Sequence, residues 1–587
     1  MSRSFRALVA ALAVLLCATG CVSLPSSGPV RTEPVREQQE DEAPVDFTPG
    51  GPERGAAPIE IVRGFLTAMQ ATPLNTSVAR QFLSTESSTA WVPERGTVVY
   101  STDSITALGQ DVLLDLSDTV RLDGRGAWLG ASGDATYTMD MVREGGEWRI
   151  DAPPDRLLIP TDHFETRFQQ YNLHFFDKSA QLLVPEPVYV PTGAQATTFL
   201  VTGMLRGPAP ELLGVERTFL PARTRLDDIS VPVTPDGTAE VPLSDEILDL
   251  GNEQLTRAFA QLAWTLRQVS GVTRLRVTVD GSPLEAPGQG PDVDVDAFPE
   301  YDPAVSWASQ SLFGIRDGRV VTQIEGDERR VSGAFGSLDL GLREIGVDLA
   351  GERIAGTTRD GRVLVAARSR VTGTAPDEDD TVEVYSGGDR LLPPAWDLHG
   401  QLWLVDDTPG GAEVYVVRNH VARRVEVDGV TGADVRSFVL SRDGTRFVAV
   451  LDRSGGDVVR IARVESEPSG RVRGLTPSER LDVSGLGIFR IRDIGWRSPG
   501  TLAVLTAPTR TTSQVLVVKI DGSSTAEEST SDAEVFRSRT RDVVTSPALS
   551  APLYLRTPDG VFYALAATGR WTGAGIEPGL RSPTFVG

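Results

Sequence analysis

The chain has 587 residues, a formal net charge of −23 and a pI near 4.7. A single hydrophobic core stops growing at roughly 250 to 300 residues, so a chain of this length should fold into several domains. We expect three, because the sequence pattern changes between three regions of the chain. The strong negative charge excludes nucleic acid and bare anionic lipid as partners, because both would be repelled.

Residues 1–20 predict a secretion signal. Arg3 and Arg6 precede an apolar stretch from residue 7 to residue 16, and small residues stand directly before Cys21. This stretch is much shorter than the roughly 20 apolar residues of a transmembrane helix, which favours a cleaved signal peptide. No later segment is long and apolar enough to span a membrane.

Cys21 is the predicted lipidation site. A small-residue triplet that ends in cysteine resembles the bacterial lipobox, although Ala18 stands where that pattern most often has leucine. The resemblance implies cleavage before Cys21, which then carries an S-diacylglyceryl and an N-palmitoyl group. Cys17 is the rival acceptor, but the bulky Leu16 before it suits signal cleavage poorly; a plain secretory signal with an incidental cysteine is the alternative. Two acyl chains or more would anchor the protein stably on the extracytoplasmic face of the cell membrane.

Residues 21–57 predict a lipidated N-terminus that continues into a disordered acidic tether. The segment is rich in Pro, Gly, Glu and Asp and has almost no large apolar residues. Such a composition buries too little surface to offset the entropy of ordering the chain.

Residues 58–160 predict an α+β domain. Pro58 is a good first helical residue, and the apolar residues that follow share one helical face: Ile59, Val62, Phe65, Leu66 and Met69. A second helix is expected at 78–83, and strands are expected at 97–100, 111–122, 135–142 and 147–150. Helices followed by a curved antiparallel sheet resemble the nuclear-transport-factor-2-like (NTF2-like) fold. Some members of that fold use a carboxylate in catalysis, but Asp134 and Asp140 lie in ordinary strand and turn positions, so we assign them no catalytic role.

Residues 188–285 predict a compact α/β or α+β domain. A helix at 197–205 ends before Gly207-Pro208, and a second helix starts after Asn252 as its N-cap. Its apolar stripe consists of Leu255, Phe259, Leu262, Leu266 and Val269. A strand follows at 272–279. The segments 204–208, 218–221, 238–243 and 275–281 resemble the GerMN module of spore-germination and envelope lipoproteins.

Residues 300–587 predict an all-β propeller. Short apolar strands flank tight turns whose glycines, 351, 400, 444, 500 and 560, recur at roughly the length of a four-stranded blade. An irregular β-sandwich is the alternative, but it gives no reason for repeated units of blade length.

The residue types that most enzymes and metal sites need are sparse. The four histidines, His163, His174, His399 and His420, lie far apart in the sequence, which argues against zinc. The acidic run 292–296 lacks the glycine and glutamate of an EF-hand, since Ala297 and Pro303 stand there, so we expect a solvated linker. The run 377–380 is expected to be an exposed loop. We predict no catalytic residue, no metal and no cofactor.

The whole chain from Cys21 resembles the actinobacterial LpqB lipoprotein family, on its opening Cys21-Val22-Ser23-Leu24-Pro25-Ser26-Ser27 and on the order of its modules. This resemblance implies a non-enzymatic partner of the extracytoplasmic part of the sensor kinase MtrB. Binding would modulate phosphorylation of the response regulator MtrA and so affect cell-wall homeostasis and division. The alternative is a cell-envelope glycan-binding protein or a propeller hydrolase.

Tryptophans of the propeller are the first candidates for anchors of a binding surface, because buried aromatic anchors carry much of the energy of protein interfaces. They are Trp396, Trp403, Trp496 and Trp571. Packing between strands is the commoner role of a propeller tryptophan and stays open as the alternative.

Overall fold

The computed structural model describes residues 46–324, 327–368, 377–483, 487, 490–524 and 534–587. Cys21 and most of the predicted tether therefore lie outside the described residues. The last part of the tether is ordered rather than free: Phe47 exchanges two backbone hydrogen bonds with Thr72, of 2.8 and 2.9 Å, and Gly55 donates to Glu147. Among the described residues, no helix has the length and apolar character needed to cross a membrane.

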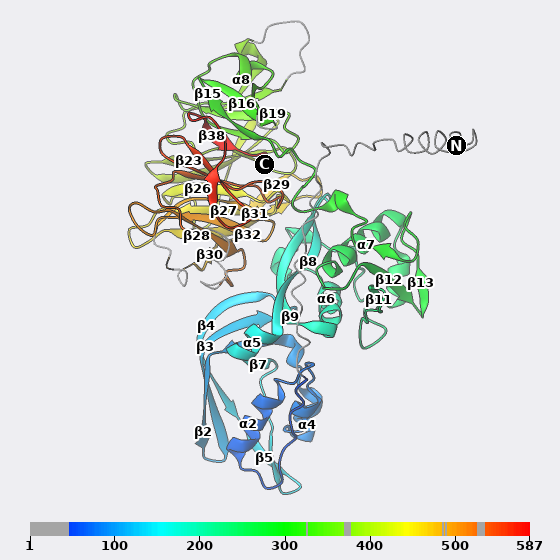
Figure 1. The fold of residues 1–587 in the computed structure, drawn as a ribbon. Coiled ribbons are helices and arrows are strands. Elements are labelled where there is room, and N and C mark those ends of the chain that lie inside the picture. The colour runs from blue at the N-terminus through cyan, green and yellow to red at the C-terminus, as the bar shows by residue number, and fades with distance from the viewer. Residues whose placement is uncertain (1–45, 325–326, 369–376, 484–486, 488–489, 525–533) are drawn as a thin grey trace, which may run out of the picture. The chain divides into compact units, whose positions relative to one another are not determined.

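The N-terminal domain packs short helices on a curved sheet (Figure 1). Its helices are α2 (Pro58–Ala68), α3 (Ser77–Arg80), α4 (Thr85–Ala90) and α5 (Thr161–Arg167), with the 3-10 turn η1 (Pro93–Arg95). Its strands are β1 (Gly96–Tyr100), β2 (Thr102–Leu108), β3 (Asp111–Asp123), β4 (Trp128–Met139), β5 (Met141–Glu144), β6 (Glu147–Ile150) and β7 (Leu157–Pro160). The sheet has the order β2-β3-β1-β7, with β4 also paired to β3. The predicted α2 stripe is in the core, since Val62, Phe65 and Met69 are fully buried.

This domain departs from the sequence expectation in two ways. The sheet is not wholly antiparallel, because β7 pairs in parallel with β1. The strand β2 was missed because its residues are almost all exposed, so it lacks the apolar alternation that marks a half-buried strand.

The second domain is an α/β unit with an added hairpin. Its elements are β8 (Phe168–Asp177), β9 (Leu183–Pro191), η2 (Gly193–Gln195), α6 (Ala196–Leu205), η3 (Pro210–Leu212), β10 (Glu216–Arg217), β11 (Thr238–Pro242), η4 (Asp245–Asp249), α7 (Asn252–Leu266), β12 (Arg274–Val279), β13 (Ser282–Leu284) and β14 (Val293–Asp294). Strands β8, β9 and β10 form one sheet, while β11 and β12 pair in parallel in another. The N-cap of α7 is Gly251, one residue before the Asn252 that we expected. Residue 188, where we expected the domain to begin, lies inside β9.

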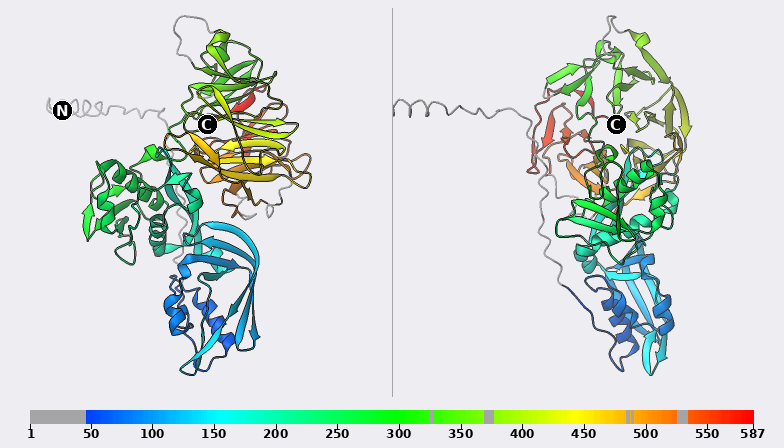
Figure 2. Two further views of the ribbon diagram at one scale, coloured as in Figure 1. Left: turned by 180° about the vertical axis from the view of Figure 1, so that it is seen from behind. Right: turned by 90° about the vertical axis from the view of Figure 1, so that its right-hand side faces the viewer.

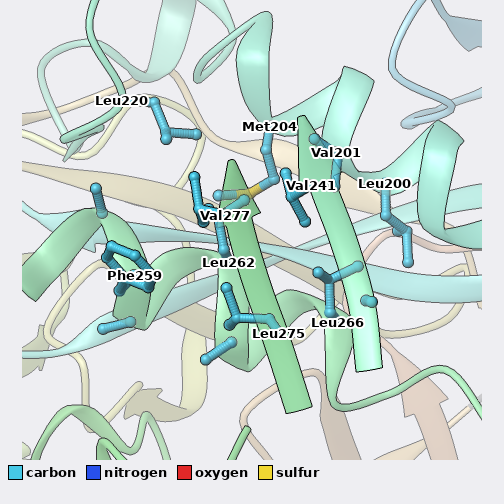
Figure 3. Packing of buried hydrophobic residues seen from close by; sticks show 14 of the residues in the cluster. Leu200, Val201, Met204, Leu220, Val241, Phe259, Leu262, Leu266, Leu275 and Val277 are labelled. Atoms are coloured by element: carbon cyan, nitrogen blue, oxygen red, sulfur yellow. The ribbon is translucent and has the colours of Figure 1, made fainter. Parts of the chain in front are cut away.

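The core of this domain lies between α6, α7 and the β11–β12 pair. Figure 3 shows Leu200 and Met204 of α6 directed toward Val241, Leu275 and Val277 of these strands, with the α7 side chains closing the other side. The predicted α7 stripe is confirmed, because all five of its residues are buried.

Within the acidic run 292–296, Val293–Asp294 forms the short strand β14 and the next two residues form a turn, so the run is not the solvated linker that we expected. Val293 and Val295 are buried, while Asp294 and Asp296 point outward, and β14 pairs with β12. Alternation of apolar and charged residues is the pattern of a half-buried strand, and it outweighs the acidic composition.

The C-terminal region is an all-β propeller. After η5 (Pro299–Tyr301), its first three sheets contain β15 (Leu312–Arg316), β16 (Arg319–Ile324), β17 (Asp327–Arg330), β18 (Leu342–Val347), β19 (Arg353–Thr358), β20 (Val363–Ala367), β21 (Thr381–Tyr385), β22 (Ala395–Trp396), β23 (Leu402–Thr408), β24 (Gly411–Arg418) and β25 (Val421–Val425). Two short helical turns also occur, α8 (Ala334–Ser337) and η6 (Glu378–Asp380). The remaining strands are β26 (Val435–Leu440), β27 (Arg446–Leu451), β28 (Val458–Ser466), β29 (Val472–Leu475), β30 (Glu479–Leu481), β31 (Ile491–Ser498), β32 (Thr501–Thr506), β33 (Gln514–Lys519), β34 (Asp542–Val544), β35 (Tyr554–Arg556), β36 (Phe562–Leu565), β37 (Trp571–Gly573) and β38 (Arg581–Thr584).

The described strands of this region form six sheets that follow one another around a ring (Figure 2). The last strand, β38, joins the first sheet in the order β17-β16-β15-β38. The ring is therefore closed by pairing the C-terminus with the start of the propeller, and closure protects the edges of the first and last sheets.

The repeated glycines mark hairpins, as the sequence predicted, but not the same hairpin in every blade. Gly351, Gly400, Gly444 and Gly500 lie between the first and second strands of their sheets, whereas Gly560 lies between the second and third. At Gly351, Gly400 and Gly444 the backbone φ is near +70°, the left-handed region that favours glycine. This shift of one hairpin explains part of the irregular spacing along the chain.

Candidate functional site

The most distinctive cluster of charged side chains joins the second domain to the propeller. Arg446, at the start of β27, has no exposed surface and donates to Glu186 of β9 and to the Pro185 carbonyl, each at 2.6 Å. Its other nitrogen lies 3.3 Å from Asp443. Arg463 of β28 makes a two-pronged contact with the same Glu186 carboxylate, at 2.7 and 2.8 Å.

A third carboxyl group completes this cluster. Glu216 of β10 is 1% exposed, and its Oε1 lies 3.8 Å from Arg463 Nη1. Burial and the neighbouring Glu186 carboxylate raise the pKa of Glu216 well above its usual range. The pKa of Glu186 shifts in the opposite direction. Burial alone would raise it, but the positive charges of Arg463 and Arg446 have the larger effect and lower it to about 2. Two arginine side chains therefore face three buried carboxyl groups, and the raised pKa of Glu216 favours its neutral form.

Sequence reasoning missed this cluster. The turn before Arg446 was recognised as a hairpin, but Glu186 is 260 residues away in the chain. The available signal was a lone arginine at the head of an otherwise apolar strand, since every residue of β27 is buried. A buried arginine requires a partner, although the sequence does not say which one.

The four candidate tryptophans are not exposed anchors. Trp396, Trp403 and Trp496 are at most 5% exposed, and Trp571 is partly buried. The Trp396 indole donates to the Gly346 carbonyl and the Trp403 indole to Asp397, both inside the propeller. Packing within and between blades is thus the role of Trp396, Trp403 and Trp496, for which the anchor interpretation is wrong, while the partly buried Trp571 packs beside Phe536.

Trp307, which the sequence did not single out, is 61% exposed, more than any of the other eight tryptophans. It lies in the connection between the second domain and β15. Tryptophan is costly to leave in water, so its exposure makes this connection a candidate contact surface.

The histidines are dispersed, as their spacing predicted. His174 is buried in β8, where burial and Arg267 lower its pKa to about 3 and keep it neutral. His399 Nε2 lies 4.0 Å from Asp177 Oδ2, while His163 and His420 are on α5 and in a turn. Within the described ranges, no group of three or more His, Cys, Asp or Glu side chains is arranged to hold a metal ion.

The remaining acidic candidates lie at the surface. Asp134 and Asp140 are exposed, and so are residues 377–380. Asp292 is held by Arg276 through two hydrogen bonds of 2.6 and 2.9 Å. These positions form ordinary surface contacts.

A cavity of about 280 Å³ lies against η1, the turn after β3, α6 and β9. Its apolar wall includes Leu157, Phe168, Tyr189 and Phe199, and Arg206 stands at its rim. Arg206 donates to the carbonyls of Glu94 and Gly124, so its guanidinium is already engaged by backbone. The cavity is at the lower limit of size for small-molecule sites, which are roughly 300 to 1,000 Å³.

Comparison with known families covers all three domains. The family model for the N-terminal domain of lipoprotein LpqB matches residues 51–165, and the model for the LpqB β-propeller domain matches residues 318–562. A third model, described as sporulation and spore germination, matches residues 172–285 between them. The chain belongs to the LpqB lipoprotein family. The predictions of family, of a GerMN-type domain and of a C-terminal propeller are thereby confirmed.

Several curated LpqB lipoproteins are similar to this chain along nearly its whole length. The relative from Streptomyces avermitilis is 28% identical, over 95% of this chain and 94% of its own length. The relative from Thermobifida fusca is 27% identical, over 92% of each chain, and that from Mycolicibacterium smegmatis is 29% identical, over 86% of each. As a member of this family the chain is a lipoprotein, and Cys21 as the modified residue stays a prediction.

Among solved structures, TolB from Acinetobacter baumannii is 13% identical, covering 58% of this chain and 86% of its own, with a TM-score of 0.34. The first GerMN domain of GerM from Bacillus subtilis is 24% identical, covering 22% of this chain and 97% of its own, with a TM-score of 0.18. At these TM-scores the family models and the strand pairing, rather than the structural neighbours, define the fold.

Proposed function

We propose that this LpqB-family lipoprotein is anchored through acylated Cys21 on the extracytoplasmic face of the cell membrane. There it binds the extracytoplasmic domain of the sensor kinase MtrB without catalysing a reaction. Binding modulates phosphorylation of MtrA and so affects cell-wall homeostasis and division.

The observation that carries this proposal is the buried charge cluster between the GerMN-type domain and the propeller. Domains of one chain move relative to one another unless their interface holds them. Here Arg446 and Arg463 have their main partner, Glu186, in the other domain, and residues from Pro44 to Gly587 form one compact unit. Such a coupled body suits a protein that acts by presenting a fixed surface to a partner.

The lipid anchor supports the same function. A protein and a kinase attached to the same membrane meet at a much higher effective concentration than two free molecules, so a modest affinity suffices. Cys21→Ser should therefore release the protein from the membrane and change MtrA phosphorylation as deletion of the whole chain does. Metabolic labelling with a fatty-acid analogue tests the site, and Cys17→Ser is the matched control.

Direct binding is the deciding experiment. The soluble mature chain carrying Cys21→Ser is titrated with the purified kinase ectodomain and, in parallel, with purified cell wall. Saturable binding to the ectodomain alone is expected. Binding to cell wall without binding to the ectodomain would replace this proposal with the second candidate.

The second candidate is a protein that binds an envelope glycan. The cavity lined by Phe168, Tyr189 and Phe199 is the observation that favours it, because aromatic faces and nearby polar groups suit a sugar ring. Phe199→Ala should weaken binding to cell wall if this candidate is correct and leave binding to the kinase unchanged otherwise.

A further inference from the structure

The segment that carries Trp307 is held in a strained conformation. Val305 has a φ of +52° and is fully buried. A β-branched residue is a genuine outlier in the left-handed region, and such strain persists only where the surroundings fix it. The Asp302 side chain fixes the turn from within, since it accepts hydrogen bonds from the backbone of Ala304 and Ser306 at 2.9 and 3.1 Å.

A buried arginine fixes the same segment from the propeller side. Arg442 is 6% exposed, and its guanidinium donates to the carbonyls of Ala304 and Val586 at 2.9 and 3.0 Å. Burial lowers the pKa of Arg442 to about 10, which still leaves it charged near neutral pH. The strained loop, the turn before β27 and the C-terminal end of the ring are thus tied at one point.

Trp307 is therefore exposed on a rigid support, and its segment is hydrogen-bonded to a second loop that carries another exposed apolar side chain. Three residues after it, Gln310 donates to Ser550 Oγ at 2.8 Å. Leu549, next to Ser550, is 73% exposed at the apex of its turn. A hydrogen bond between loops 240 residues apart thus links the segments that carry the two apolar side chains.

A small uncharged cavity adjoins these loops. It has a volume of about 200 Å³. Its lining includes Gln310, Leu312, Gln323, Tyr554, Ala574 and Ile576. Because this is smaller than the roughly 300 Å³ of the smallest typical ligand pockets, it suits one inserted side chain rather than a whole ligand.

We propose that Trp307, Leu549 and this cavity, together the Trp307 patch, form the contact surface for a protein partner that inserts an apolar side chain flanked by a basic one. This inference rests on the proposed function, and the partner is the kinase ectodomain. Strain held by a buried clamp keeps Trp307 in place before binding, which lowers the entropy lost on association. The pattern of an exposed aromatic anchor beside a small pocket is that of an interface hot spot.

The negative charge of this chain beside the strained loop is the reason to expect a basic side chain on the partner. The exposed acidic residues Asp294 and Glu300 precede the strained loop in the chain, which has a net charge of −23, while Asp296 between them is paired with Arg267 at 2.8 Å. In the part of the chain that the structure describes, no arginine or lysine is stacked on the Trp307 ring. An indole that is 61% exposed can stack with a cation of the partner.

The test measures affinity for the kinase ectodomain with the full mature chain. Trp307→Ala should weaken binding about 30-fold, the effect of losing one hot-spot residue. Ile229→Ala and Val421→Ala are matched controls, because both side chains are exposed and apolar, at 93% and 68%, and lie outside the patch. All variants should melt at the wild-type temperature, since none of the three side chains is in a core.

Glu300→Lys tests the charge of the partner. Association should slow about threefold in dilute buffer and recover in concentrated salt, because exposed charges act mainly on the rate of encounter and are screened. Faster association in this variant would overturn the basic partner chemistry.

The outcomes separate the two proposals. If the wild-type chain binds and Trp307→Ala binds equally well, the patch is wrong and the kinase-binding function stands. If the wild-type chain does not bind the ectodomain at all, the proposed function fails and the patch inference fails with it.

Discussion

Replacing Arg446 by methionine should uncouple the GerMN-type domain from the propeller. Methionine has about the length of the arginine stem and keeps the apolar packing, but it cannot donate to Glu186, Pro185 or Asp443. These acceptors now meet Arg446, which has no exposed surface, at 2.6, 2.6 and 3.3 Å. The variant leaves Arg463 as the only arginine bound to Glu186, while Asp443 keeps its hydrogen bonds from Ser441 and Thr445.

We expect Arg446→Met to lower the free energy of unfolding by about 3 to 5 kcal/mol, the usual cost of removing one partner from a buried ion pair. The exposed pair Arg471–Glu467, in the turn between β28 and β29 of the same sheet, gives a matched control. Its atoms are 3.6 Å apart and the Arg471 side chain is 61% exposed, so Arg471→Met should cost at most about 0.5 kcal/mol.

Differential scanning calorimetry of the full mature chain distinguishes the two variants. In the wild type and in Arg471→Met, we expect the two domains to unfold together. In Arg446→Met, the transition of the GerMN-type domain should move to a lower temperature and separate from that of the propeller. Equal thermograms for the two variants would refute the view that the buried cluster couples the domains.

Two further predictions concern the pH dependence of the domain coupling and the closure of the propeller ring. The coupling between the GerMN-type domain and the propeller should weaken as the pH rises above about 4.5. The raised pKa of Glu216 means that the folded chain binds a proton there that the unfolded chain has already released, so folding becomes less favourable as the pH rises. It should also weaken as the pH falls from about 4.5 toward 2, where Glu186 becomes protonated. Glu216→Gln should abolish the loss at higher pH, and unchanged melting curves across pH 5 to 8, measured by the same calorimetry, would contradict the assigned proton. Deleting residues 581–587 removes β38 and leaves β15 as an open edge, so the propeller should lose its cooperative transition in far-ultraviolet circular dichroism. A truncated chain that melts like the full chain would show that the ring does not depend on this closure.

Local sequence patterns determined much of the architecture. The apolar stripe of α7 needs only the spacing of its own residues, and the hairpins around Gly351, Gly400 and Gly444 need only a turn residue between two apolar strands. Module order and the resemblance of short segments to known families rest on the same local information. These features were predictable because the residues that form them are neighbours in the chain.

The run 292–296 shows where an interpretation from composition was wrong. Its acidic composition suggested a linker, but Val293 and Val295 are buried in the core of the second domain, and β14 pairs with β12. For β2 the local sequence held too little information. Its sequence carries no strand signal, and pairing with β3 imposes the conformation.

The candidate sites depended almost wholly on tertiary structure. Arg446 meets Glu186 across 260 residues, and Gln310 meets Ser550 across 240. The difference between Trp403 in the core and Trp307 at the surface is likewise invisible in the chain, because a tryptophan has the same side chain in both places. Burial, the pKa of a carboxyl group and the exposure of an aromatic ring are properties of the surroundings. Those surroundings exist only once distant segments have packed, which is why the sequence determined the modules and only the folded structure decided where they could act.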